Sequence, residues 1–218
     1  MKSNNLLASA CLGSIGLAAA IGALALAEPA KEMKPAGQPA EMQLPPGWTP
    51  EDFQACVAAG TPGDMQKFLA EGAGTWQGKT QSWMAPDTPA MNGECICVIT
   101  PMMDGRFVKS EFTGEFPGMG PFSGLGLYGF DNVSKKFVSS WIDNQSTGMM
   151  QGTGEVSPDR KTLTWKLTYN CPINKKPAIM REIETITGPN TKTMEMWTTD
   201  PKSGKEYKMM LIEFTRKS

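Results

Sequence analysis

Apolar and polar residues alternate with a period of two along almost the whole chain beyond Gly74, as in β-strands that bury one face. The run TLTWKLTY at residues 162–169 is the clearest example. Short turns rich in Gly, Pro and Asp separate the runs and leave no room for a crossover helix, so the sheet is expected to be antiparallel. We predict ten strands, near residues 75–84, 93–100, 105–116, 122–130, 136–143, 148–156, 162–170, 178–187, 192–199 and 206–216.

A meander of this size can form a sandwich or a closed barrel. Closure removes the exposed edges that an open sheet of ten strands would present, so we favour an all-β, up-and-down barrel over residues 74–218. A barrel of more than eight strands has an interior that side chains do not fill. The pattern therefore predicts a cavity.

The N-terminal region has the features of a secretory signal. Lys2 precedes an apolar run that ends at Ala25-Leu26-Ala27, so residues 1–27 are expected to be a signal peptide cleaved after Ala27, with no stable membrane span afterwards. An uncleaved anchor, or a lipid on Cys11, are the alternatives. The prediction places the mature protein outside the cell or in the periplasm.

Two further segments precede the predicted barrel. Residues 28–47 contain five prolines among Ala, Glu, Lys and Gln, which indicates a disordered linker. Residues 48–73 contain two Thr-Pro steps, Thr49-Pro50 and Thr61-Pro62, each typical of a helix N-terminus with the threonine as N-cap. We expect two short helices there.

Composition excludes several classes of function. The chain has no histidine, which removes the usual catalytic base and the commonest metal and haem ligand. A net charge of -1 gives no basic surface for nucleic acid, and no phosphate-binding loop or nucleotide fingerprint is present. We therefore expect no cofactor, no metal site and no nucleic-acid partner, and the sequence identifies no protein partner.

Several motifs carry a family resemblance. Gly74-Thr75-Trp76 at the start of the first strand and Arg216 at the end of the last resemble the GxW and terminal Arg of lipocalin-like and fatty-acid-binding-protein-like barrels. In that family the Arg lies over the Trp and closes the barrel floor, so the resemblance implies this role for Trp76 and Arg216. Residues 61–216 also resemble the domain-of-unknown-function 1579 family, through the motifs DGRF at 104–107, GLYGFD at 126–131, WID at 141–143 and EMW at 195–197. This resemblance implies a fold and no chemistry.

Five side chains are candidates for ligand binding in the cavity. Trp141 and Asp143 share a strand face, so an inward Trp would bring the carboxylate inward too; alternatively Asp143 only accepts hydrogen bonds within a turn. Arg181 on the predicted strand 178–187 is expected to lie on the same side of the sheet as Glu195 and Trp197 on the predicted strand 192–199. Arg181 and Glu195 either face the cavity as an ion pair or form a solvated ion pair on the outer surface of the barrel.

The cysteines allow more than one arrangement. Cys95 and Cys97 point to one face at a separation too large for an unstrained mutual disulfide. The remaining pairings are Cys56 with Cys95 and Cys97 with Cys171, or Cys56 with Cys97 and Cys95 with Cys171. Buried thiols are the other alternative.

Sixteen methionines, several in adjacent pairs such as Met149-Met150 and Met209-Met210, raise the question of a soft metal. Thioether sulfur suits Cu(I). Consecutive residues of a strand point to opposite faces, however, so such pairs are not expected to chelate together. Methionine is also a common filler of irregular apolar cavities.

Taken together, the sequence predicts a secreted barrel that binds a small, largely apolar ligand in its cavity without catalysis. The main alternative is a structural or interaction module with a packed barrel, which a cavity smaller than about 300 Å³ would favour. Cu(I) binding, and a carboxylate-dependent enzyme that uses Asp143 and Glu195, are two further alternatives.

Overall fold

The computed structural model describes residues 44–116 and 118–217. The predicted signal peptide, its cleavage site, Cys11 and nearly all of the predicted linker lie outside the described residues. Among the described residues, no helix is both long and apolar enough to cross a membrane.

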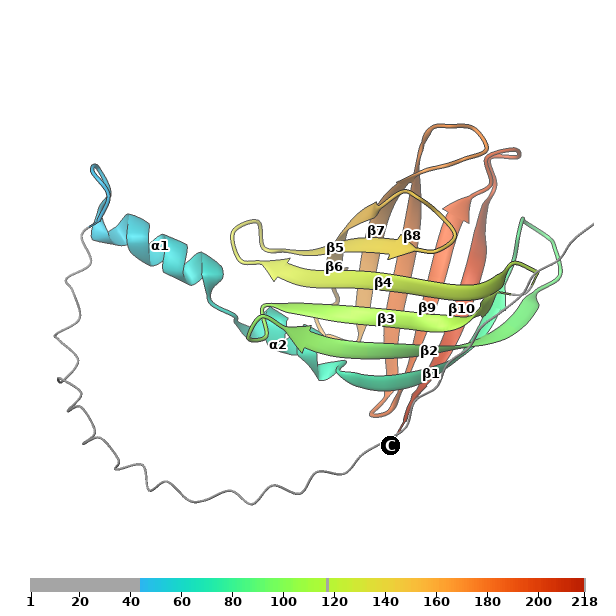
Figure 1. Cartoon of the computed structure of the whole chain (residues 1–218), viewed down its shortest axis with the longest axis horizontal. Helices are drawn as coiled ribbons and strands as arrows, with labels where there is room; N and C mark the ends of the chain where they lie inside the picture. The colour runs from blue at the N-terminus through green and yellow to red at the C-terminus, as the bar shows by residue number, and fades with distance from the viewer. Residues whose placement is uncertain (1–43, 117, 218) are drawn as a thin grey trace, which may run out of the picture. The chain divides into compact units, whose positions relative to one another are not determined.

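The described chain forms a closed barrel of ten antiparallel strands (Figure 1), which confirms the predicted fold class. Each strand pairs with its neighbours in sequence, and β1 pairs with β10 to close the barrel. The strands are β1 Gly74–Ser82, β2 Met91–Met102, β3 Phe107–Phe116, β4 Gly120–Asp131, β5 Lys136–Asp143, β6 Met150–Val156, β7 Thr162–Asn170, β8 Pro177–Gly188, β9 Thr191–Thr199 and β10 Glu206–Arg216.

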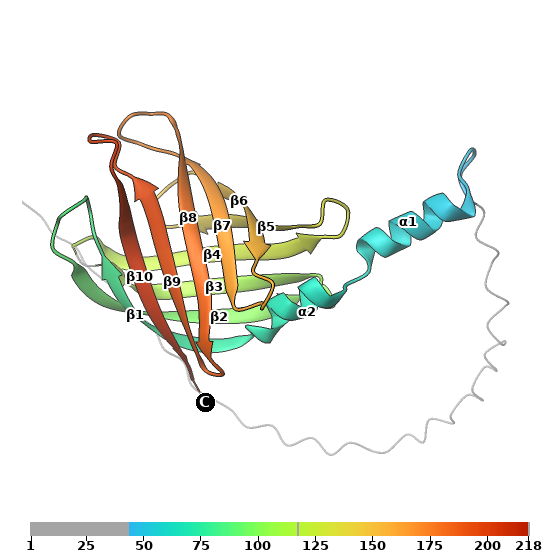
Figure 2. The same cartoon turned by 180° about the vertical axis from the view of Figure 1, so that it is seen from behind.

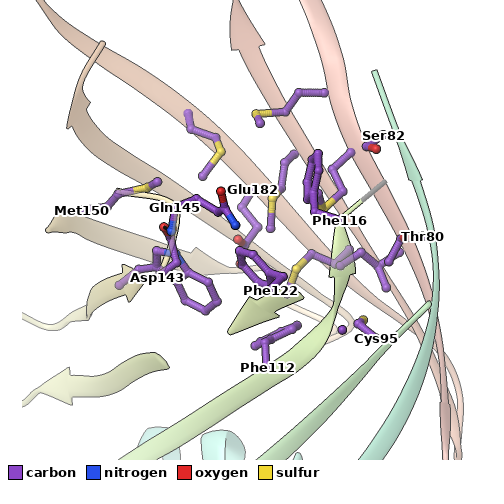
Figure 3. Close-up of a pocket in the computed structure, with 18 of the residues that line it drawn as sticks. Thr80, Ser82, Cys95, Phe112, Phe116, Phe122, Asp143, Gln145, Met150 and Glu182 are labelled. Carbon is purple, nitrogen blue, oxygen red and sulfur yellow. Dashed lines mark hydrogen bonds between the residues drawn. The ribbon is translucent and has the colours of Figure 1, made fainter. Parts of the chain in front are cut away.

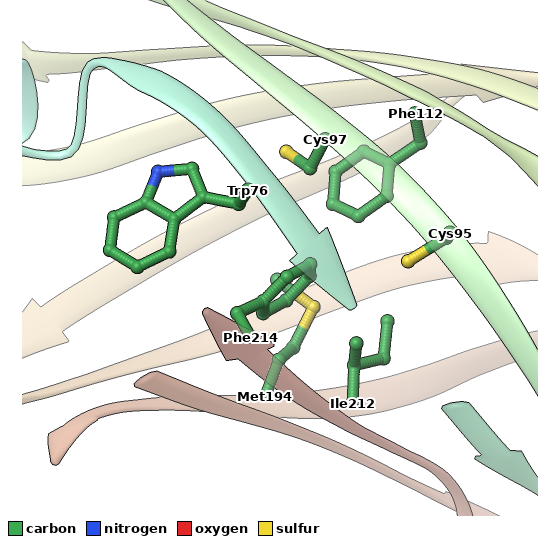
Figure 4. Packing of buried hydrophobic residues seen from close by; sticks show 7 residues of the cluster. All are labelled: Trp76, Cys95, Cys97, Phe112, Met194, Ile212 and Phe214. Atoms are coloured by element: carbon green, nitrogen blue, oxygen red, sulfur yellow. The ribbon is translucent and has the colours of Figure 1, made fainter. Parts of the chain in front are cut away.

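Strand alternation divides the side chains between an inner and an outer face. On β7, Leu163, Trp165 and Leu167 are buried inside, and the polar residues between them face outward. The buried residues form two clusters. One gathers around Trp76, Cys97, Phe112 and Phe214 (Figure 4), and the other lies around Phe137, Trp165 and Met180.

Trp76 and Arg216 meet at one end of the barrel, as the family resemblance implied. The two residues are register partners on β1 and β10, and the guanidinium carbon of Arg216 lies 4.3 Å from the centroid of the Trp76 ring. Arg216 also donates hydrogen bonds to the carbonyls of Ala73 and Glu71, and Trp76 Nε1 donates to Gly72 O at 2.9 Å. These contacts tie the last strand to the chain segment that enters the first.

Two helices precede the barrel, α1 Pro50–Gly60 and α2 Asp64–Glu71 (Figure 2). Met65, Phe68 and Leu69 of α2 pack against the second buried cluster. Phe68 and Leu69 also line the same cavity as Trp76, so α2 covers the Trp76 end of the barrel. We call this end the floor and the opposite end the mouth. No residue of α1 is buried, so α1 does not join the core.

The helix starts confirm one predicted N-cap and correct the other. Thr49 caps α1, and its hydroxyl oxygen accepts a hydrogen bond from Asp52 N at 3.2 Å. Thr61 instead lies at the C-terminus of α1, where its hydroxyl donates to Val57 O at 2.7 Å, and Gly63 is the N-cap of α2. The predicted role of the Thr61-Pro62 step is wrong because only three residues separate the end of α1 from the start of α2, so the same threonine lies beside both helix ends.

Asn132, in the β4–β5 turn, holds the end of α1 against the floor. Its side-chain amide donates hydrogen bonds to three carbonyls at the α1 C-terminus, those of Ala58, Ala59 and Thr61. The side-chain oxygen of Asn132, Oδ1, accepts a hydrogen bond from Gln66 Nε2 of α2 at 3.1 Å. Asn132 therefore satisfies some of the carbonyls that a helix end leaves without partners, and Arg106 Nε donates to another, Gly60 O, at 3.0 Å.

Candidate functional site

The barrel interior contains two chambers, of about 270 and 260 Å³. Phe112, Tyr128, Trp165 and Met194 line both chambers and form the partition between them. We call the first the mouth chamber and the second, next to α2, the floor chamber. Each volume lies slightly below the range of about 300–1,000 Å³ that is usual for drug-sized ligands.

The wall of the mouth chamber is mainly aromatic rings and methionines (Figure 3). Trp141, Phe112 and Phe122 form an aromatic group: the Phe112 ring meets the Trp141 ring edge-on at 5.4 Å between centroids, and Phe122 stacks on Trp141 at 6.4 Å. Seven methionines complete the apolar wall: Met119, Met150, Met180, Met194, Met196, Met209 and Met210. Unbranched methionine side chains change shape readily, so this wall can adapt to a ligand.

A β-bulge explains why two consecutive methionines line one chamber. The register between β9 and β10 shifts between Lys208 and Met210, which leaves Met209 as an extra residue. Met209 and Met210 therefore both reach the chamber, and the expectation that adjacent methionines always face opposite sides is wrong at this point. For Met149-Met150 it is right, because Met149 is exposed and only Met150 lines the chamber.

Trp141 and Asp143 both line the mouth chamber. Asp143 therefore faces the chamber and also accepts a hydrogen bond within its turn, as the two alternative interpretations proposed separately. Asp143 Oδ2 accepts a hydrogen bond from Trp141 Nε1 at 2.8 Å, and Oδ1 accepts from Gln145 N at 2.9 Å within the turn. A glycine makes room for this arrangement, since a Cβ at Gly124 would lie 2.3 Å from the Trp141 ring. Both Asp143 oxygens already have a donor.

Glu182 is the polar group that sequence reasoning missed. It lies on the inner face of β8, is only 6% exposed and lines the mouth chamber (Figure 3). Among the described residues it has no hydrogen bond and no ion pair. Burial, with a smaller effect of the nearby Glu184 charge, raises the pKa of Glu182 to about 8, and Lys192 partly opposes this.

Two further polar atoms near this chamber have no hydrogen-bond partner in the described chain, Ser139 Oγ and Trp165 Nε1. Trp165 is 1% exposed and is the register partner of Glu182 across β7 and β8. Buried polar atoms without partners are costly in a folded protein, and each one therefore calls for an explanation. Ser139 and Trp165 line the mouth chamber together with Glu182, which marks this chamber as the candidate site, and a third unpartnered atom, Ser110 Oγ, belongs to a residue that lines the floor chamber.

The structure corrects the predicted placement of Arg181, Glu195 and Trp197. Met180 and Glu182 on β8 and Met194 and Met196 on β9 take the inner face, so the residues between them face outward. The predicted shared side of the two strands is confirmed, but it is the exterior, and the residue that lies near Arg181 is Trp197.

On that outer face, cations surround the Trp197 ring. Arg181 and Lys208 lie 5.4 and 5.2 Å from the ring centroid. Lys208 Nζ forms an ion pair with Glu195 at 2.7 Å, and its hydrogen bond is the main reason that the pKa of Glu195 is lowered. Arg181 pairs with Glu206 at 3.3 Å rather than with Glu195. These are surface ion pairs, which contribute little to stability.

The floor chamber holds a compensated ion pair. Lys192 Nζ lies 2.7 Å from Glu184 Oε2 and 5.1 Å from the centroid of the Trp76 ring. Burial lowers the pKa of Lys192, but the charge and hydrogen bond of Glu184 outweigh it, so the net shift is upward. Lys192 is thus paired with Glu184, and Glu182 has no ion-pair partner among the described residues.

The four cysteines of the described residues are free thiols, so neither predicted disulfide pairing is present. Cys56 is exposed on α1, and Cys95 and Cys97 are buried inside the barrel on β2. Cys171 is buried just after β7, and the alternative of buried thiols describes it together with Cys95 and Cys97.

Soft-metal chemistry gains little from these thiols. Burial raises the pKa of Cys95 to about 11 and that of Cys97 to about 12, which disfavours the thiolate that binds metals. Within the described residues no group of three or more His, Cys, Asp or Glu side chains is placed to hold a metal ion.

Comparison with solved structures gives matches at low sequence identity. The crystal structure of Rv2717c from M. tuberculosis superposes with a TM-score of 0.53 at 13% identity, over 72% of this chain and all of that one. The S-type phycobiliprotein lyase CPES from Guillardia theta gives a TM-score of 0.49 at 10% identity, over 75% of this chain and 97% of that one. The comparison with curated proteins gave no match.

The family comparison is more specific than the structural one. A family model described as "Protein of unknown function (DUF1579)" matches residues 61–216. The match includes α2 and the whole barrel, and therefore both chambers. The chain belongs to the DUF1579 family.

Proposed function

We propose that the protein binds a small, largely apolar ligand in the mouth chamber, without catalysis. The observation that carries the proposal is Glu182, a buried carboxyl that faces an apolar chamber and has no partner among the described residues. A ligand with an apolar body and one polar group would fill the methionine and aromatic wall and provide that partner. Ser139 Oγ would gain a partner in the same way.

The main alternative, a packed scaffold, is supported by the chamber volume of about 270 Å³, which is slightly below the usual lower limit. Volume alone would favour that alternative. A barrel selected only for packing, however, has no reason to retain an unpaired carboxyl, where an apolar side chain of similar size would be more stable. The unpaired groups therefore outweigh the small difference in volume, and they favour a small ligand.

The proposal is tested by filling the chamber. Thr80 on β1 lines the mouth chamber, and its neighbour Gln81 is exposed on the outer face. Thr80→Trp should abolish binding of a neutral apolar fluorophore such as Nile red and of any ligand that native mass spectrometry finds on the purified protein. Gln81→Trp adds the same side chain outside the barrel and should leave binding unchanged.

Two results would contradict the proposal. One is purified protein that carries no extractable ligand and gives no saturable Nile red signal. The other is equal loss of binding in the Thr80→Trp and Gln81→Trp variants, which would place the probe outside the chamber. Either result would favour the scaffold function.

We also propose that the mature protein is secreted or periplasmic. The proposal rests on the N-terminal pattern of residues 1–27, a short basic start followed by an apolar run and a small-residue cleavage site.

A further inference from the structure

The mouth chamber is electrostatically one-sided. Among the described residues its lining includes four acidic residues and no Lys or Arg. Glu94 and Glu115 are exposed, and strand alternation turns their side chains outward, since Cys95 and Gly114 occupy the inner face beside them. The carboxylates that face the chamber are therefore Asp143 at its rim and Glu182 deep inside.

These two carboxylates differ in what they already bind. Asp143 accepts hydrogen bonds from Trp141 Nε1 and Gln145 N. Glu182 is more than nine-tenths buried and accepts none from the described residues. The basic residue that lowers its pKa, Lys192, is paired at 2.7 Å with Glu184 in the floor chamber. Glu182 is the acceptor available to a ligand.

The aromatic wall suits the same kind of ligand. The rings of Phe112, Phe122 and Trp141 lie together on one side of the chamber, and Tyr128 and Trp165 lie in the partition. Aromatic faces attract cations, and more strongly where water is excluded. A carboxylate ligand, by contrast, would lie near Glu182 and Asp143 with no basic lining residue to balance its charge.

We infer that the mouth chamber selects ligands with a cationic amine head and an apolar tail, with the ammonium bound to the Glu182 carboxylate. The inference rests on the proposed function, since it names the class of ligand for the same chamber. Binding changes no covalent bond. At neutral pH Glu182 is largely protonated in the free protein, so pairing with an ammonium group would release its proton to solvent.

The experiment compares three probes with the same tail, octylamine, octanol and octanoate. Binding at neutral pH can be followed by calorimetry and by the fluorescence of Trp141 and Trp165 in the chamber wall. Octylamine should bind most tightly and octanoate most weakly. Glu182→Gln should weaken octylamine about tenfold or more and leave octanol nearly unchanged, because a charge-assisted hydrogen bond is lost.

Asp143→Asn is the matched control, since it neutralises the rim carboxylate and should retain the preference for the amine. If no probe binds the wild-type protein, the proposed function fails and the inference with it. If octanol and octanoate bind as tightly as octylamine, or if Asp143→Asn rather than Glu182→Gln removes the preference, binding stands and the amine inference fails.

Proton release provides a measurement that needs no variant. The titratable groups near Glu182 are Cys97 on β2, Tyr128 on β4, Glu184 on β8 and Lys192 on β9. Calorimetry of the wild-type protein in two buffers of different ionisation enthalpy should show close to one proton released for each octylamine bound near pH 7, and none for octanol. Equal proton release with octanol and octylamine would overturn the inference.

Discussion

Trp165 and Glu182 are direct register partners on β7 and β8, with both side chains inside the barrel. Side chains in such a pair have Cβ atoms roughly 4.5–5.5 Å apart. Trp165 Nε1 is a hydrogen-bond donor without a partner in the described chain, and the Glu182 carboxyl lies opposite it on the neighbouring strand. The most buried part of the sheet therefore contains the polar groups that packing alone does not explain.

The raised pKa of Glu182 makes stability depend on pH. Between the ordinary value of 4.5 and about 8, the unfolded chain ionises this carboxyl and the folded protein keeps it protonated. The folded state then binds more protons, so this group lowers the free energy of unfolding as pH rises through that interval, by at most about 1.4 kcal/mol per pH unit. Above about pH 8 both states are ionised and the effect is constant.

Glu182→Gln should remove this dependence. Urea unfolding of the wild-type protein and the variant at several pH values gives the difference in their stability, in which the other carboxylates cancel. The difference should increase in favour of the variant from pH 4.5 to about 8 and then level off. A difference that stays flat over this interval would show that Glu182 titrates normally.

The fold could be predicted from the sequence almost completely, because one face of each strand is buried and the period-two pattern records this directly. All ten predicted strands lie within about three residues of those observed. The direction of each face could not be predicted equally well. On β8, Arg181 and Ile183 lie on one face, and Met180 and Glu182 lie on the other. The buried face is the one that carries the Glu182 carboxyl. Ionisable side chains usually face solvent, and Glu182 is an exception, so the buried face of β8 could be identified only from the closed barrel.

Gly124 is the position where an added methyl group has the clearest consequence. A Cβ there would lie 2.3 Å from the Trp141 ring, so Gly124→Ala must displace the ring and its hydrogen bond to Asp143. We expect a loss of about 1–3 kcal/mol in stability and a changed tryptophan emission. Gly148→Ala is the control, because a Cβ at Gly148 meets nothing within 4 Å. Equal effects of both changes would contradict the packing at Trp141.

Arg216 should stabilise the closed barrel through its side chain. Arg216→Ala removes the cation–π contact with Trp76 and the hydrogen bonds to two carbonyls, with an expected loss of about 2–4 kcal/mol in urea unfolding. Arg216→Lys keeps the charge without the planar fork and should recover only part of this loss. Lys217→Ala changes the exposed neighbour and should have little effect; a loss as large as that of Arg216→Ala would point to the strand end rather than the guanidinium.

Thiol reactivity distinguishes the free cysteines from the predicted disulfides. In native protein that starts at Glu28, Ellman's reagent should modify Cys56 rapidly and Cys95, Cys97 and Cys171 only slowly, because these three are buried. Unfolding in denaturant without reductant should expose four thiols in all, and Cys56→Ser should remove the fast phase. Two or no thiols in denaturant would instead demonstrate a disulfide.

The N-terminal prediction can be tested by expressing the full sequence in a bacterium. Cleavage after Ala27 should give a periplasmic protein whose intact mass begins at Glu28. Retention of residues 1–27 in a membrane fraction would instead support the anchor, and a lipid-modified mass that begins at Cys11 would support lipidation.

The candidate site could be predicted only in part, and the reason differs between residues. Trp141 and Asp143 were found because the aromatic and the acid share one face at a strand end. Met209 escaped because a β-bulge cannot be recognised from alternation, which it interrupts. Arg181, Glu195 and Trp197 form a compact group as expected, but the group decorates the outer surface.

The seven methionines of the mouth chamber make its wall open to oxidation. An oxidant that entered the chamber would convert thioethers to sulfoxides, adding polar oxygen atoms to an apolar surface and reducing the free space. The same wall that adapts to a ligand would then reject an apolar tail, and a bound ligand would shield the sulfurs behind it. A bound ligand would therefore protect the methionines from oxidation, and oxidised methionines would prevent the ligand from binding.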